Sequence, residues 1–386
     1  MDLVKRSNVK RAFALAVALV ALAVALVPSA AFADEQLSAG ALQSGAAANT
    51  QQVAIATQAS ASPAYALLRS DGNLWRCTAK GAPVSKYWNG NAGIMNELNR
   101  VRTVFVASDV TEVTTDVFAW NRYTFSSGTK NDSRYSVRLS SSYLKNVGTV
   151  KFLTNSAGKS ACKLIGDNTF SYASNIKKVV NLNKTKVARI GDYAFAQTNI
   201  TGISFPKTLK KLGQRAFNKC EKLKSLGGLN KTKLSSLGKN AFYSCSKLKS
   251  VALPSTCKVV SDYAFEYCSG LKSIKLGSKT TKLGSGVFYN CEKLASITLP
   301  ATCKKMDNSV FSGCSALRKV VMRSKTVVTH ASNARYSMSQ FYNTPIAVEG
   351  NSAYIYVPKS ALAKYRSSDR DYSNPWYNLR TKFRAI

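Results

Sequence analysis

The sequence predicts an α/β repeat solenoid in which parallel strands stack, one strand in each leucine-rich repeat of about 23 residues. The first observation is a phrase with leucine or isoleucine at fixed offsets, and the second is the phenylalanine that anchors each copy. The anchors recur at intervals of 22, 25, 23, 23 and 23 residues: Phe195, Phe217, Phe242, Phe265, Phe288 and Phe311. A period of 20 to 29 residues with leucine at set offsets is typical of a leucine-rich-repeat stack. One copy cannot bury its own apolar face, so stacking must create the core.

The first 33 residues are typical of a secretory signal peptide. Four Lys or Arg residues precede an apolar run over residues 12–27, and small residues surround Ala33. We therefore expect cleavage after Ala33 and a mature chain that starts at Asp34. The alternative is an uncleaved membrane anchor. No second apolar run of spanning length follows, so we expect no transmembrane anchor in the mature chain.

The rest of the chain divides by composition and by the repeat. The predicted segments are a flexible linker (34–62), an N-terminal cap with a first repeat-like unit (63–120), a polar insertion (121–146), the repeat array (147–322) and a C-terminal cap (323–386). Asp71-Gly72 between apolar runs predicts a β-hairpin that covers the open first edge of the sheet. Counting Phe118 and Phe170 as further anchors, we expect eight repeat units.

Each repeat has a strand and a turn. Ile274 and Leu276 alternate with Ser273 and Lys275, which places the aliphatic residues inward. Proline follows several of these strands and should end them, because it has no backbone N–H to donate to a β-ladder. The next segment should turn Phe inward, with room for only a turn or two of helix. In the C-terminal cap we expect a last strand at residues 353–358 and a short helix with Ser360 as its N-cap.

The net charge is +36, and removing the leader with its four cations and one Asp leaves +33. Such a charge favours contact with anionic surfaces, which include cell-wall polymers, acidic glycans, anionic lipid heads and free nucleic acid. The alternative is that lysine merely solvates the turns of the repeat. That alternative explains exposed lysines, but it does not explain the shortage of acids.

The basic residues recur at fixed offsets from the anchors, so stacking should align them in columns. The predicted polyanion stripe consists of Lys222, Lys224, Lys247, Lys249, Lys272 and Arg318. Lys210, Lys258 and Lys304 form a further column, seven residues before an anchor. The alternative is a solvated edge of the sheet. Aromatic residues do not interleave with these columns, so we expect no specific binding of nucleic acid.

Nine cysteines follow the repeat more closely than a disulfide framework would. Five stand three residues after an anchor: Cys220, Cys245, Cys268, Cys291 and Cys314. Three stand eight residues before one, at Cys162, Cys257 and Cys303, and Cys77 lies outside the register. We expect the repeat cysteines to be small buried hydrophobic residues, and the five to be mostly reduced despite export.

The search for chemistry finds no catalytic pattern. His330 is the only histidine, which excludes a two-histidine metal site, and its neighbours Thr329, Ser332 and Asn333 give no Ser-His-Asp or Cys-His set. We expect no metal, no cofactor and no enzyme activity. The alternative is a secreted hydrolase built around His330.

The phrase Leu-x-x-Ile-x-Leu-Pro…Ile-Gly-x-x-Ala-Phe-x-x-Cys resembles the BspA-type leucine-rich repeat of bacterial surface and secreted proteins. The segments 190–195 and 216–223 are close matches, while Thr198 stands where the pattern has Cys and Val287 where it has Ala. The resemblance covers roughly residues 64–386. It implies a solenoid at the cell surface, often in adhesion or contact with host or cell-wall macromolecules, and it fixes no ligand.

Overall fold

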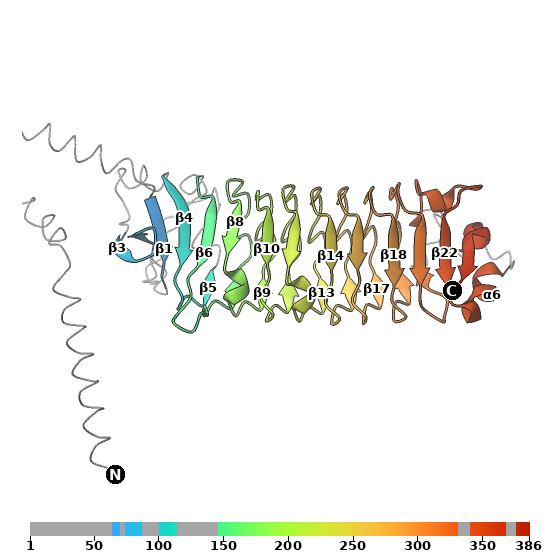
Figure 1. Ribbon diagram of the computed structural model, residues 1–386, viewed down its shortest axis with the longest axis horizontal. Helices are drawn as coiled ribbons and strands as arrows, with labels where there is room; N and C mark the ends of the chain where they lie inside the picture. Colours follow the sequence, from blue (N-terminus) through green and yellow to red (C-terminus); the bar gives the residue numbers. More distant parts are fainter. Residues whose placement is uncertain (1–63, 70–73, 87–99, 114–145, 331–339, 368–375) are drawn as a thin grey trace, which may run out of the picture. The chain divides into compact units, whose positions relative to one another are not determined.

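The computed structural model describes residues 64–69, 74–86, 100–113, 146–330, 340–367 and 376–386 (Figure 1). The predicted leader and linker, Phe118 and nearly all of the polar insertion lie outside these residues. None of the helices in the described ranges has the length and apolar character needed to cross a membrane.

Two rows of strands run through the repeats (Figure 1). The longer strands are β1 Ala64–Leu68, β2 Leu74–Cys77, β3 Pro83–Lys86, β4 Val101–Val106, β6 Thr149–Phe152, β8 Lys178–Val180, β10 Gly202–Ser204, β12 Ser225–Gly227, β14 Ser250–Ala252, β16 Ser273–Lys275, β18 Ser296–Leu299, β20 Lys319–Met322, β22 Tyr354–Val357 and β23 Phe383–Ala385. The two-residue strands are β5 Glu112–Val113, β7 Leu164–Ile165, β9 Arg189–Ile190, β11 Lys211–Leu212, β13 Ser236–Leu237, β15 Val259–Val260, β17 Lys282–Leu283, β19 Lys305–Met306 and β21 Thr329–His330. The helices are η1 Leu182–Lys184, η2 Leu229–Lys231, η4 Pro345–Ala347, α6 Lys359–Arg366 and η5 Tyr377–Lys382.

The short strands form one nine-stranded parallel sheet, from β5 to β21. The longer strands form four sheets, ordered β3-β2-β1-β4-β6-β8, β10-β12, β14-β16 and β18-β20-β22-β23. β1 pairs antiparallel with β2 and parallel with β4, so the predicted hairpin extends the first edge of its sheet. The parallel solenoid is confirmed.

Side-chain alternation explains why these segments are strands. In β16, Ile274 is buried while Ser273 and Lys275 are exposed, as the period of two requires. In the short strands from β5 to β19 the second residue points inward, and Leu283 is fully buried. Each coil therefore contributes apolar residues from two sides to one shared core.

The prediction of one strand per repeat was wrong, because each repeat also has a two-residue strand. The segment around each anchor is also a series of turns, without the short helix that we expected. Left-handed backbone explains this: from Phe170 to Phe311, the residues two before and two after each anchor have positive φ. Lys219, for example, has φ 56°, and Asn240 has φ 54°. Two left-handed residues so close together cannot continue a right-handed helix.

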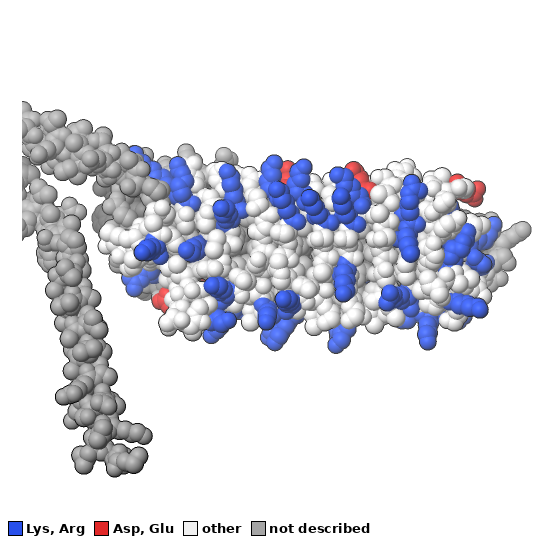
Figure 2. Space-filling model, in the orientation of Figure 1, with Lys and Arg blue, Asp and Glu red and all other residues white. Residues whose placement is uncertain are grey.

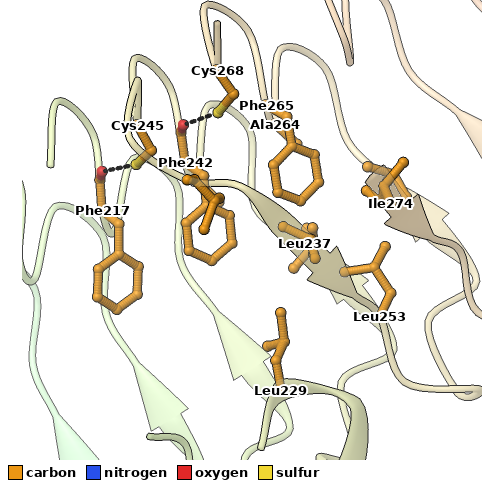
Figure 3. Close-up of a cluster of buried hydrophobic side chains, with 14 of the residues drawn as sticks. Phe217, Leu229, Leu237, Phe242, Cys245, Leu253, Ala264, Phe265, Cys268 and Ile274 are labelled. Carbon is orange, nitrogen blue, oxygen red and sulfur yellow. Dashed lines mark hydrogen bonds between the residues drawn. The ribbon is translucent and has the colours of Figure 1, made fainter. Parts of the chain in front are cut away.

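The anchor phenylalanines form one buried stack, as predicted (Figure 3). Ring centroids of successive anchors from Phe195 to Phe311 lie 5.2 to 5.9 Å apart, and the ring planes differ by 5° to 9°. Phe170 extends the stack at one end and Phe341 at the other. Phe341 follows Phe311 by 30 residues, so it falls outside the period and was not predicted as an anchor.

The C-terminal segment closes the stack. Phe341 meets Trp376 at 6.4 Å between ring centroids, and the Trp376 indole nitrogen donates to the Val328 carbonyl at 2.9 Å. The helix runs from Lys359 to Arg366 with Pro358 at its N-cap position. Ser360 therefore lies inside the helix, and its prediction as the N-cap was wrong.

Candidate polyanion-binding columns

The six cations of the predicted stripe all lie exposed, at or near the residues where the longer strands begin. Lys224, Lys249 and Lys272 directly precede β12, β14 and β16. The backbone N–H of Lys272 donates to the Lys249 carbonyl at 2.9 Å, so these two residues are neighbours in the stack. Arg318 takes the same place before β20, and its N–H donates to the Ala295 carbonyl at 3.0 Å.

The column continues toward the N-terminus beyond the predicted residues. The N–H of Lys224 donates to the carbonyl of Thr201, and the N–H of Thr201 donates to the carbonyl of Lys177. Lys177 stands seven residues after Phe170, so the offset rule could have found it. Thr201 and Ala295 interrupt the row of cations. We call the row of Lys177, Lys224, Lys249, Lys272 and Arg318 the strand-entry column.

Lys222 and Lys247 belong to a second row, two residues earlier in the chain, and both are exposed. Gly270 occupies the equivalent place in the next repeat. A Cβ added to Gly270 would lie 2.3 Å from the Ser246 carbonyl oxygen, so that position cannot carry lysine without a shift of the backbone. Close packing of the coils therefore breaks this row.

Few carboxylates oppose these cations. Ion pairs among the described residues include Arg189–Asp167, Lys282–Asp307 and Lys305–Asp307, and none of these three involves the six predicted stripe residues. Figure 2 shows Lys and Arg gathered along the two long edges of this face, with few Asp or Glu among them. Glu221 and Glu292 are exposed beside the rows and locally reduce the positive potential.

Several acids instead link the coils. Asp192 accepts the N–H of Gln214 at 2.8 Å, and Asp262 accepts the N–H of Ser285 at 2.9 Å. Asp167 accepts the N–H of Asp192 at 2.8 Å and also pairs with Arg189. Each of these carboxylates thus accepts a hydrogen bond from a backbone N–H group in the next repeat. Part of the small number of acidic side chains therefore makes structural contacts between coils.

The third set of cations is spaced more widely. Backbone hydrogen bonds, and the pairing of β11 with β13, order this position as Lys163, Ala188, Lys210, Ser235, Lys258, Thr281 and Lys304 along the stack. Lysine therefore occurs in every second coil, and Ala188, Ser235 and Thr281 occupy this position in the coils between. We call Lys210, Lys258 and Lys304 the alternating column. Lys304 also donates to the hydroxyls of Ser324 at 2.9 Å and Thr326 at 3.0 Å.

The repeat cysteines are fully buried, as predicted, and all nine cysteines are free. Each of the five after an anchor donates its Sγ–H to an anchor carbonyl in the preceding coil; for Cys245 this is Phe217 at 3.3 Å, and for Cys268 it is Phe242 at 3.2 Å (Figure 3). Burial raises the pKa of the Cys220, Cys268 and Cys314 thiols to about 12. Neutral thiols are poor nucleophiles, so these residues are packing groups.

Thr198 takes the cysteine position in its repeat. Its hydroxyl donates to the Phe195 carbonyl at 2.8 Å and lies 3.4 Å from Cys220 Sγ. This departure from the pattern keeps a buried side chain with a hydrogen bond.

The described chain offers no metal-binding cluster of His, Cys, Asp or Glu. His330 is the second residue of β21 and pairs with Met306; its side chain lies outside what the structure describes. The hydrolase alternative therefore gains no supporting geometry.

A row of tyrosines on the anchor turns was missed by the sequence analysis. Tyr243, Tyr267 and Tyr289 contact edge to face at 5.6 and 5.8 Å between ring centroids, and Tyr267 is 41% exposed. Tyr243 and Tyr289 stand one position after an anchor and Tyr267 stands two after, so their placement near the anchors was visible in the sequence.

The BspA type leucine rich repeat region matches in six copies, over residues 149–237 and 235–349. No curated protein sequence matches the chain. Similar solved structures include a leucine-rich repeat protein from Bacteroides ovatus (18% identity, TM-score 0.43, 83% of this chain and 92% of that one). The Leucine Rich Repeat protein of T. pallidum is similar at 22% identity, with a TM-score of 0.36 over 49% of this chain and 75% of that one.

A leucine rich cell surface protein from Faecalibacterium prausnitzii is similar at 17% identity, with a TM-score of 0.30 over 74% of this chain and 93% of that one. All three TM-scores lie below 0.5, so the family assignment rests on the sequence match alone. The matched repeats extend from residue 149 to residue 349 of a 386-residue chain, which is more than half of it. This chain belongs to the BspA type leucine-rich-repeat family.

Proposed function

We propose that this chain is an exported, non-catalytic binding protein that adheres to anionic macromolecules, such as a cell-wall polymer or an acidic host glycan, through its strand-entry column. The observation that carries the proposal is the stacking of exposed Lys249 on exposed Lys272, in register and without an acidic partner among the described residues. The basic leader pattern at residues 1–33 supports export.

A stack makes weak contacts additive. One exposed ion pair contributes little, because water screens it and ordering a lysine costs entropy. Coils repeat at about 4.8 Å, the spacing of neighbouring strands, so a linear polyanion can meet several cations along one line. Binding of this kind releases counterions and weakens steeply as salt rises. It should respond to charge density more than to polymer chemistry.

The test compares two charge reversals of equal size. Lys224→Glu, Lys249→Glu and Lys272→Glu together should remove most of the affinity for heparin and teichoic acid, measured at two salt concentrations. The slope of log affinity against log salt should fall in magnitude by about 2 to 3, because about three ion contacts are lost. Lys210→Glu, Lys258→Glu and Lys304→Glu change the net charge equally in the alternating column, and they should cost much less.

Equal losses in the two variants would mean that only net charge matters, and unchanged affinity in the first would reduce the column to a solvated face. Binding to a host protein that persists at high salt would favour a protein-specific adhesin. Stoichiometric labelling by a serine- or cysteine-directed trap reagent would favour the hydrolase built around His330.

A further inference from the structure

A hollow of about 660 Å³ opens over β14, β16 and β18, beside the strand-entry column. Its lining includes Ser273 and Lys275 of β16 and Ser296 and Thr298 of β18, the outward-facing residues of these strands. None of the column cations lines it. Figure 2 shows the middle of this face as largely uncharged between the basic edges.

An irregularity of the repeat borders the hollow at one end. Asn230 at one end belongs to η2, which lies within the 25-residue interval between Phe217 and Phe242. Arg323 stands at the other end, directly after β20. Between them the lining mixes small polar residues with aliphatic residues such as Ile274 and Ile297. A Cβ added to Gly277 would lie 2.2 Å from the Pro254 carbonyl oxygen. The space is therefore built into the packing of the coils.

The lining combines hydroxyls with positive charge. Ser273, Ser296 and Thr298 are exposed, and no hydrogen bond to their hydroxyls is made within the described chain. Lys275 and Arg323 are exposed cations, and the residues that line the hollow include no carboxylate. Hydroxyls donate and accept hydrogen bonds, whereas lysine and arginine only donate. A matching ligand needs both hydroxyl groups and negative charge.

We propose that this hollow binds an acidic sugar residue of a polysaccharide. The carboxylate or sulfate of the sugar meets Lys275 and Arg323, and its hydroxyls pair with Ser273, Ser296 and Thr298. Charge-assisted hydrogen bonds to the anion supply affinity, and the neutral hydroxyl pairs supply selectivity for sugar over other polyanions. The site does not depend on the strand-entry column, so either can fail without the other.

Hydroxyl removal without a change of charge tests the site. The variant Ser273→Ala, Ser296→Ala, Thr298→Val is compared with Ser204→Ala, Ser225→Ala, Ser250→Ala, three exposed strand serines outside the hollow. The probes are an oligogalacturonate and a polyphosphate of matched charge, and calorimetry at one salt concentration gives the affinities. Thermal melts check that both variants fold.

The hollow variant should bind oligogalacturonate about tenfold more weakly, because three modest hydrogen bonds are lost. Its affinity for polyphosphate and both affinities of the control variant should change less than twofold. Lys275→Gln with Arg323→Gln should also weaken oligogalacturonate about tenfold. The proposal is overturned if the hydroxyl variant binds oligogalacturonate like the wild type, or if it loses both polymers equally. The strand-entry reversal, measured alongside, reports on the proposed function alone.

Discussion

The phenylalanine stack and the strand-entry column follow the same repeat, yet only the stack is continuous. Every anchor from Phe170 to Phe311 is phenylalanine, and Phe341 extends the row after an irregular interval. The column has Thr201 and Ala295 among its cations. Both rows are aligned by backbone hydrogen bonds between coils, so backbone geometry does not explain the difference.

Burial explains it. A missing ring inside the stack leaves a cavity whose cost grows by about 24 cal/mol for each Å³. A missing cation on the surface costs about 0 to 1 kcal/mol. The core therefore tolerates no gap, while a binding surface can lose single members and still work as a row. Regularity in the sequence thus identifies the scaffold more reliably than it identifies the site.

The largest expected effect is inside the stack. Phe265→Ala removes a fully buried ring that lies 5.4 Å from Phe242 and 5.9 Å from Phe288 between centroids. We expect a loss of about 3–5 kcal/mol in the free energy of unfolding, because both neighbours lose a stacking partner. Urea unfolding measures it. The matched surface change, Lys249→Ala, should stay within about 0.5 kcal/mol. An unchanged melting temperature for Phe265→Ala would contradict the stack as the main source of stability.

Much of the core was predictable because burial enforces the period. The offsets placed the anchors and Cys268 in the interior, where the structure has them. The second strand of each repeat was missed because a two-residue segment such as Lys282–Leu283 is too short to show alternation. Phe341 was missed because 30 residues, instead of about 23, separate it from Phe311 in the sequence.

The next effect concerns the distance between coils. Gly213→Ala would place a Cβ 2.3 Å from Asp192 Oδ1 and 2.5 Å from the Gly191 carbonyl carbon. Because backbone cannot yield easily, we expect a loss of about 1–3 kcal/mol. Gly148→Ala is the control, since its Cβ would meet nothing closer than 3.7 Å. Chemical denaturation of both variants decides the point, and equal stability would mean that the coils can separate locally at little cost.

The cysteine ladder should make the core sensitive to alkali. Burial raises the pKa of Cys268 from 9.0 to about 12, so the folded state keeps the thiol proton that the unfolded chain releases. The unfolded state then binds fewer protons above pH 9, and stability falls as pH rises toward 12. Cys268→Thr, which copies the residue that Thr198 supplies in its own repeat, removes the titrating thiol. Wild type should be the more stable at pH 8, and its advantage should shrink at pH 10 in urea titrations.

A constant difference between the two proteins would show that the thiol titrates alike in both states. Mass spectrometry adds an independent check, because we expect the five ladder cysteines to remain reduced in secreted protein. Disulfides between consecutive coils would contradict that expectation.

The candidate site was predictable only in part. Exposure of Lys224, Lys249 and Lys272 followed from their offset, because residues before an alternating strand lie at its edge. The break at Gly270 depends on a carbonyl of the neighbouring coil, and no spacing rule carries that information. The hollow joins Asn230 to Arg323 across several repeats, so it appears only when the coils are stacked.

The smallest expected effect comes from a substitution that fills a gap in the strand-entry column. Ala295→Lys fills the gap before Arg318 with a residue that is exposed, so the fold should accept it within about 0.5 kcal/mol. One added ion contact should raise heparin affinity by about two- to fivefold at low salt and increase the salt slope by about 1. Ser156→Lys adds the same charge at an exposed turn outside the column and serves as the control. If the two variants gain equally, the row has no geometric role and only the total charge attracts the polymer. A larger gain for Ala295→Lys would mean that continuity matters, and that the natural gaps hold binding below what the stack could provide.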